Sequence, residues 1–75
     1  MGEKEDQKFV SEAKAHYSSK NELAAALADH FSRQYKLDLH ITRTESEWVI
    51  SSLHRIVRVH YAESVPSAVR KIVSG

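Results

Sequence analysis

Hydrophobic and polar positions recur at helical spacing in two long segments of the chain, the first of which covers residues 20–35. An apolar stripe that returns about every three to four residues is typical of a helix packed on a core. Its members are Leu23, Leu27, His30, Phe31 and Gln34. Ser19 and Glu22 form a capping box, in which hydroxyl and carboxylate satisfy free backbone N–H groups. The pattern predicts a helix over residues 20–35.

The second segment covers residues 45–62 and is richer in β-branched side chains. Its apolar positions are Val49, Ile50, Leu53, Ile56, Val57, His60 and Tyr61. They fall on one side of an ideal helix, and Thr44 with Glu47 repeats the capping box just before Trp48. Residues 55–61 also alternate as a strand does, and valine and isoleucine favour strands. The periodicity of the whole segment and the capping box favour a helix over residues 45–62.

The two ends of the chain are also predicted to be helical. Residues 5–17 form the first helix, and Pro66 occupies the first turn of a short C-terminal helix, where its missing N–H is not needed. The inward residues are Phe9, Val10, Ala13 and Tyr17 in the first helix and Val69, Ile72 and Val73 in the last. Residues 37–42 alternate like a strand, and we expect them to form an extended connector whose apolar side chains enter the core.

These elements predict an all-α fold, a small bundle of three to four helices with one extended connector. The scarcity of glycine supports this prediction, because Gly2 and Gly75 are the only glycines and tight hairpin turns rely on residues that accept positive φ. The alternative is an α+β fold with two N-terminal helices, a β-hairpin or three-stranded meander over residues 37–61, and a C-terminal helix. Either way, residues 1–75 form one domain, and we expect residues 1–4 to be disordered.

Composition narrows the class of protein. The formal net charge is +1, with 11 Lys/Arg against 10 Asp/Glu, which is not the strong basic excess common in nucleic-acid binders. The chain contains no cysteine, so a reducing compartment fits best. Its N-terminus has no apolar signal core, and no window approaches the roughly 18 apolar residues of a membrane span. We therefore expect a cytoplasmic protein that does not enter a membrane.

Residues that carry chemistry do not occur in catalytic or ligand-binding patterns. The five histidines are His16, His30, His40, His54 and His60, and no two of them have the i,i+4 spacing with which one helix grips a metal ion. For nucleophilic catalysis, the sequence offers neither a cysteine nor a Gly-x-Ser-x-Gly elbow. It also lacks the glycines that phosphate-binding loops need. The sequence predicts no catalytic residue, no metal site and no cofactor, and a protein that is not an enzyme.

A second stripe of the predicted helix over residues 45–62 is the candidate interface. It consists of Trp48, Ser52, Arg55 and Val59. Tryptophan and arginine are enriched at interface hot spots. The stripe predicts a small protein–protein interaction module that acts as an adaptor, inhibitor or regulator of a larger protein. The competing interpretation is that the N-terminal helix covers this stripe. A homodimer is a further expectation, because a chain this short has a small core.

The alternative function is that of a nucleic-acid-binding or transcription-associated regulator. It depends on a basic patch in the second half of the chain. The patch consists of Arg43, Arg55, Arg58, Arg70 and Lys71. Such residues neutralise phosphates, but Glu47 and Glu63 interrupt them and no helix-turn-helix pattern is present. We therefore rank nucleic acid below protein as the partner.

Overall fold

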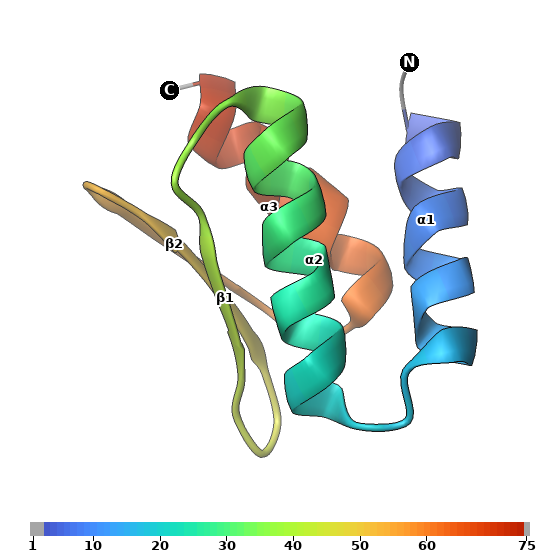
Figure 1. Cartoon of the computed structure of the whole chain (residues 1–75). Coiled ribbons are helices and arrows are strands. Elements are labelled where there is room, and N and C mark those ends of the chain that lie inside the picture. Colours follow the sequence, from blue (N-terminus) through green and yellow to red (C-terminus); the bar gives the residue numbers. More distant parts are fainter. Residues whose placement is uncertain (1–2, 75) are drawn as a thin grey trace.

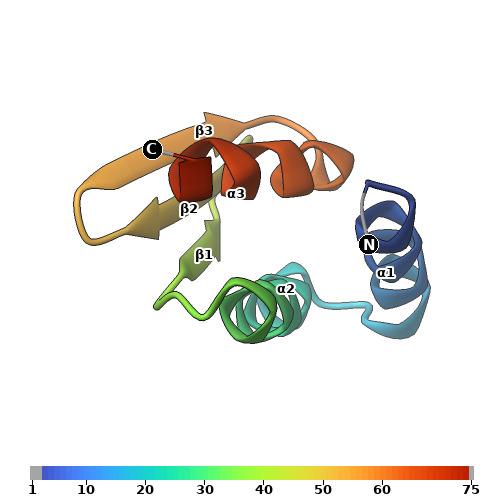
Figure 2. The same ribbon diagram turned by 90° about the horizontal axis from the view of Figure 1, so that it is seen from above.

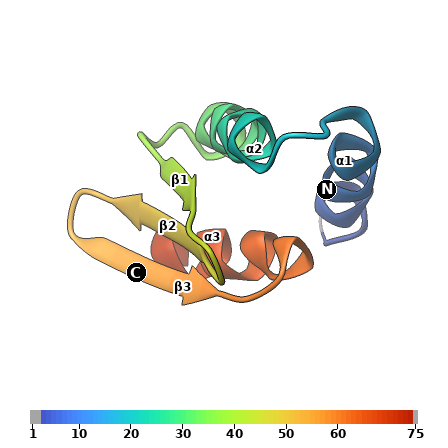
Figure 3. The same cartoon turned by 90° about the horizontal axis from the view of Figure 1, so that it is seen from below.

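The computed structural model describes residues 3–74 and shows an α+β fold. The elements, in chain order, are α1 (Glu3–His16), α2 (Lys20–Tyr35), β1 (His40–Arg43), β2 (Trp48–Ser52), β3 (Arg55–Val59), the short 3-10 helix η1 (Ala62–Ser64) and α3 (Val65–Ser74). The strands form an antiparallel sheet in the order β1-β2-β3 (Figure 1). Helices α2 and α3 lie against one face of this sheet, and α1 lies beyond them on the side away from it (Figures 2 and 3).

The all-α prediction is wrong, and the α+β alternative with a three-stranded meander matches the structure. The segment predicted as one helix, residues 45–62, instead forms β2, β3 and the connection to α3. Its register is regular, with Trp48 opposite Val59 and Ile50 opposite Val57. β-branched side chains pack well on a pleated surface, and here their preference for strands outweighs the helical periodicity. Residues 37–42 are likewise not a lone connector, because β1 pairs with β2.

The second capping-box motif forms a hairpin loop instead of a helix start. The hydroxyl of Thr44 accepts a hydrogen bond from the backbone N–H of Glu47 at 3.0 Å, which is the bond that an N-cap makes. The backbone N–H of Thr44 also donates to the carbonyl of Glu47 at 2.9 Å and closes the loop between β1 and β2. A Ser/Thr-x-x-Glu motif is therefore compatible with both outcomes.

Neither hairpin needs a glycine. Leu53 and His54 form the two-residue turn between β2 and β3, since Ser52 is paired with Arg55. Among the described residues Lys36 alone has a positive φ, 56°. The turns that rely on glycine or asparagine are thus not used, and the chain reverses through ordinary backbone conformations. The scarcity of glycine was for this reason a poor argument against a meander.

The predictions for the three helices are largely confirmed. The hydroxyl of Ser19 accepts from the N–H of Glu22 at 3.4 Å as the N-cap of α2, which ends at Tyr35 with Lys36 in the left-handed conformation. Pro66 lies in the first turn of α3, as predicted. Helix α1 begins at Glu3, so part of the segment expected to be disordered is helical, while residues 1 and 2 lie outside the described residues.

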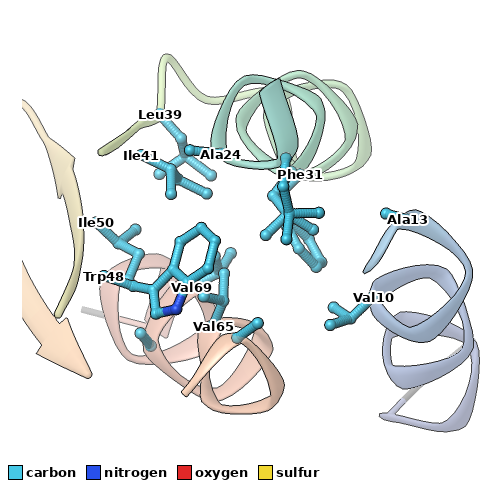
Figure 4. Close-up of a cluster of buried hydrophobic side chains, with 14 of the residues drawn as sticks. Val10, Ala13, Ala24, Phe31, Leu39, Ile41, Trp48, Ile50, Val65 and Val69 are labelled. Atoms are coloured by element: carbon cyan, nitrogen blue, oxygen red, sulfur yellow. The ribbon is translucent and has the colours of Figure 1, made fainter. Parts of the chain in front are cut away.

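The apolar core fills the space between the sheet and the helices (Figure 4). Its buried members include Val10, Leu27, Phe31, Leu39, Ile41, Trp48, Ile50, Val65, Val69 and Ile72. Alternate residues of each strand point inward, so that Ile41, Trp48 and Ile50 face α2 and α3. The opposite face of the sheet carries no helix (Figures 2 and 3).

Polar contacts fasten α1 to the rest of the molecule. The carboxylate of Asp6 is 1% exposed and accepts from Gln34 of α2 at 3.0 Å and from Arg70 of α3 at 2.9 Å. Lys14 forms an ion pair with Glu63 at the surface. A single buried carboxylate therefore connects all three helices of the described chain.

Candidate functional site

Three exposed large apolar side chains lie at the end of the molecule that holds the β2–β3 turn: Leu53 (86% exposed), Ile56 (63%) and Val73 (42%). A fourth among the described residues, Tyr61 (70%), follows the opposite end of β3. Leu53 is in the β2–β3 turn, and Ile56 is paired with Ser51 beside that turn. Val73 comes from the C-terminal part of α3, which lies near the same end (Figure 2). Leaving apolar surface in contact with water is unfavourable, so a cluster of this kind marks a candidate contact surface.

A small hollow lies between the β2–β3 turn and the end of α3. We call it the turn-end hollow; its volume is about 230 Å³ and its lining consists of Leu37, Ser52, Leu53, His54, Arg55, Ile72 and Val73. Small-molecule sites usually measure about 300–1,000 Å³. The turn-end hollow is thus too small for most ligands of that kind, and its size fits one or two side chains of a docking peptide.

A second hollow adjoins the first across Val73. It measures about 420 Å³ and is lined by Tyr35, Arg70, Lys71, Val73 and Ser74. Among the described residues, no acidic residue lines either hollow. Arg55 and Lys71 take part in no ion pair within residues 3–74, whereas Arg70 is held by Asp6. The two hollows therefore form an apolar surface with a cationic rim.

The four residues of the predicted interface stripe lie together, but not on the surface of a helix. Trp48 is paired with Val59 and Ser52 with Arg55, so all four face the helix-covered side of the sheet. Trp48 is only 4% exposed and belongs to the core. Arg55 alone of the four is exposed, at the rim of the turn-end hollow. The helical spacing that joined the four residues does not exist in the structure, and Trp48 has almost no surface to offer a partner.

The predicted basic patch is divided among several surfaces. Arg43 stacks on the Trp48 ring, 5.5 Å from its centroid, and donates to the backbone carbonyl of Thr44. Arg58 is exposed on the helix-free face of the sheet, opposite Val49. The remaining three residues, Arg55, Arg70 and Lys71, line the two hollows. Two of the five predicted residues thus lie apart from the other three.

A third hollow lies between α1 and α2, and its lining includes Asp29 and Arg33, which pair with each other. It measures about 540 Å³ and is lined by Phe9, Tyr17, Ala26, Asp29, His30, Arg33 and Gln34. Asp29 and Arg33 form an ion pair at 3.1 Å, and the ring of His30 stacks on Phe9 with the ring centroids 3.7 Å apart. Because these groups pair with one another, the hollow offers less to a partner than the turn end does.

Within residues 3–74, no three histidine, aspartate or glutamate side chains come together in a way that could hold a metal ion. No helix within these residues is both long and apolar enough to cross a membrane.

Comparison with known protein families, with curated proteins and with solved structures found no match. The site therefore rests on its own geometry. Sequence reasoning missed Leu53 and Val73, because both were assigned to the inward faces of predicted helices. The dipeptide Leu53-His54 between two β-branched runs was the available signal for the turn, but a turn without glycine or asparagine is hard to recognise.

Proposed function

We propose that this chain is a small non-enzymatic protein-binding module, of the adaptor, inhibitor or regulator class, that docks a partner through the turn-end hollow. The partner segment carries a large apolar side chain that enters the hollow and acidic side chains that meet its cationic rim. The observation that carries the proposal is the exposure of Leu53 and Val73, with Arg55 in the lining of the turn-end hollow and Lys71 in that of the adjoining hollow. Among the described residues, neither lining includes an acidic one.

The energetics of binding favour such a partner. Covering exposed Leu53 and Val73 removes apolar surface from water, at about 25 cal/mol for each Å² buried. Arg55 and Lys71 lose no ion pair with the described part of the chain when they meet an acidic segment. Complementary charge at the rim speeds association and excludes basic partners more than it raises affinity. The apolar contacts therefore supply the affinity and the cations supply the selectivity.

A protein partner explains this surface better than nucleic acid does. Phosphate contacts need several cations on one surface, and here Arg43 stacks on Trp48 while Arg70 is paired with Asp6. Exposed Leu53 and Val73 would contribute little to the binding of a phosphate backbone. As to location, the absence of cysteine supports the cytoplasm as the compartment in which the module works.

Selection from a random peptide library displayed on phage tests the proposal. The wild-type protein is expected to enrich peptides that combine leucine, phenylalanine or tryptophan with aspartate or glutamate. A variant with Leu53→Ser and Val73→Ser is expected to enrich none of them. Because alanine scanning finds costs above about 1 kcal/mol at central contacts, loss of both anchors should weaken a selected peptide more than tenfold.

A matched control alters the hollow between α1 and α2. Replacing Ala26, which lines the hollow between α1 and α2, by serine should leave peptide binding unchanged. Enrichment of basic peptides, or peptides that bind the wild type and the double serine variant equally well, would refute the proposal. Duplex DNA added as a competitor should not displace the peptides.

A further inference from the structure

Strand β3 is an open edge of the sheet. It follows β2 at the end of the order β1-β2-β3, and nothing lies beside its outer edge in Figures 2 and 3. None of the backbone hydrogen bonds found outside helices and strands in residues 3–74 involves residues 55–59. An edge of this kind presents unpaired N–H and C=O groups and is a template for another strand.

The composition of β3 suits strand pairing. Its five residues, Arg-Ile-Val-Arg-Val, include no proline or glycine, and its pairing with β2 has no bulge from Ser52 opposite Arg55 to Trp48 opposite Val59. Ile56 is 63% exposed on the helix-free face. Natural proteins protect edge strands from pairing with other chains by proline, by bulges and by charged side chains. Strand β3 has neither a proline nor a bulge, so the charged residues Arg55 and Arg58 are the protection that remains.

The two arginines select a register for self-pairing instead of preventing it. Two copies of the chain form one continuous sheet when a two-fold axis perpendicular to the sheet relates them. Residues paired across this axis point to the same face of the sheet, so the pairing register can change only by an even number of residues. With Val57 opposite its own copy, Ile56 faces Arg58 and Arg55 faces Val59 of the second copy. Every residue of the strand is then paired, and no arginine opposes another.

The neighbouring registers are worse. A shift by two residues in one direction brings Arg58 opposite Arg58 of the second copy, and like charges directly opposite each other are destabilising. A shift in the other direction places the turn residues Leu53 and His54 against β3 of the second copy. One register is thus singled out by charge and by strand length.

We infer that β3 pairs antiparallel with β3 of a second copy of this chain, with Val57 at the two-fold axis, to form a continuous six-stranded sheet. This interface shares Arg55 with the lining of the turn-end hollow, but the inference does not depend on the proposed function. A short chain buries a small fraction of its surface on folding, so association adds burial and backbone hydrogen bonds that one copy lacks.

Charge variants at position 56 test the register. Ile56→Lys places a cation opposite Arg58 at both ends of the interface, whereas Ile56→Glu places an anion there. Sedimentation equilibrium across a concentration series is expected to show the wild type rising from 8.5 kDa toward twice that mass. The Ile56→Lys variant should remain at 8.5 kDa, the Ile56→Glu variant should dimerise, and the double variant I56K/R58E should recover dimerisation.

A cross-link gives an independent readout. The chain has no cysteine, so Val57→Cys introduces a single thiol that faces its own copy. Opposed Cα atoms in antiparallel sheets lie about 4.5–5.5 Å apart, within the range that a disulfide spans. Mild oxidation should link this variant covalently, while a Val73→Cys control should form no cross-link.

Three results would overturn the inference. The first is a wild type that remains at 8.5 kDa at every soluble concentration. The second is equal association of the lysine and glutamate variants, and the third is equal cross-linking of the two cysteine variants. Circular dichroism should show the Ile56 variants folded, because Ile56 lies outside the core. Peptide binding at the turn-end hollow, measured on monomeric Ile56→Lys, keeps failure of the dimer distinct from failure of the proposed function.

Discussion

Ion pairs of Asp6 with Arg70 and of Lys14 with Glu63 tie α1 to the rest of the molecule. Arg55 and Lys71, by contrast, line the hollows beside exposed Leu53 and Val73. At the α1 end the partners come from different elements, so the contacts serve to hold the fold together. At the turn end no ion pair within residues 3–74 includes either cation. The paired charges therefore hold α1 in place, whereas the two cations at the turn end are the ones that we propose meet a partner.

The largest effect on folding is expected at Asp6. Replacement by alanine leaves Arg70 and Gln34 without their shared acceptor, and removing one partner of a buried pair typically costs about 3–5 kcal/mol. Since the Arg70 side chain is 30% exposed and can be partly hydrated, we expect about 2–4 kcal/mol. Urea unfolding of Asp6→Ala measures this loss.

The control for that experiment is Glu12→Ala, which removes an exposed carboxylate from the same helix. Its free energy of unfolding should stay within about 0.5 kcal/mol of the wild type. A similar loss in both variants would show that Asp6 acts only through the general charge of α1.

The next largest loss of stability is expected on removal of a side-chain hydroxyl that accepts a backbone hydrogen bond, at Thr44 in the hairpin loop or at Ser19 at the start of α2. Thr44→Ala removes the acceptor for the N–H of Glu47, and Ser19→Ala removes the equivalent acceptor for Glu22. Loss of such a cap costs about 0.5–2 kcal/mol. Because the bond at Thr44 is shorter, 3.0 Å against 3.4 Å, Thr44→Ala should lower the free energy of unfolding more than Ser19→Ala. The reverse order in thermal unfolding would contradict the hairpin loop described here.

A smaller, pH-dependent effect is expected at Glu63. The hydrogen bond from Lys14 lowers the pKa of this carboxyl from its ordinary value of 4.5, with help from the Glu63 backbone N–H and the Lys14 charge. A lowered folded pKa contributes stability that is present above 4.5 and lost as the pH falls through the folded pKa. Both side chains are about half exposed, so the pair belongs with surface ion pairs worth about 0–1 kcal/mol.

Removal of the cation tests this dependence. Lys14→Ala should destabilise the protein at neutral pH, and the difference from the wild type should vanish in acid, as measured by thermal unfolding from pH 7 downward. Lys8→Ala removes a charge from the exposed side of α1 and should show no such convergence. A difference that persists unchanged in acid would mean that Lys14 acts through packing.

The smallest effect on folding is expected at the turn end. Leu53→Ser together with Val73→Ser should change the free energy of unfolding by no more than about 0.5 kcal/mol for each substitution, because both side chains lie outside the buried core. Thermal unfolding measures it. A loss of several kcal/mol would assign these residues to folding and would remove the contrast between the two ends.

The sequence predicted the helices well and the middle of the chain poorly, and the two Ser/Thr-x-x-Glu motifs show why. Both hydroxyls accept the N–H three residues later. After Ser19, the N–H of Leu23 bonds to the carbonyl of Ser19 and the helix continues; at Thr44, the residue's own N–H bonds to Glu47 and the chain turns back. What decides between them is whether a strand such as β1 is available for pairing, which is a tertiary property.

The site was harder to predict for the same reason. Trp48 looked like an interface residue only because a helix was assumed, and on β2 the same residue points into the core. Arg55 and Lys71 were predicted as basic surface residues, but their proximity depends on how the β2–β3 turn packs beside α3. Local pattern reveals which residues are polar or apolar, but not which distant segments share a surface.

The most direct test of the turn-end hollow is a ¹⁵N–¹H NMR titration of the wild-type protein with a peptide selected from the displayed library. We predict that the backbone amide shifts concentrate at residues 52–55 and 71–73, and that the Leu53→Ser, Val73→Ser variant shows none of them. Shifts centred on the hollow between α1 and α2, or shifts that persist in the double serine variant, would contradict the account.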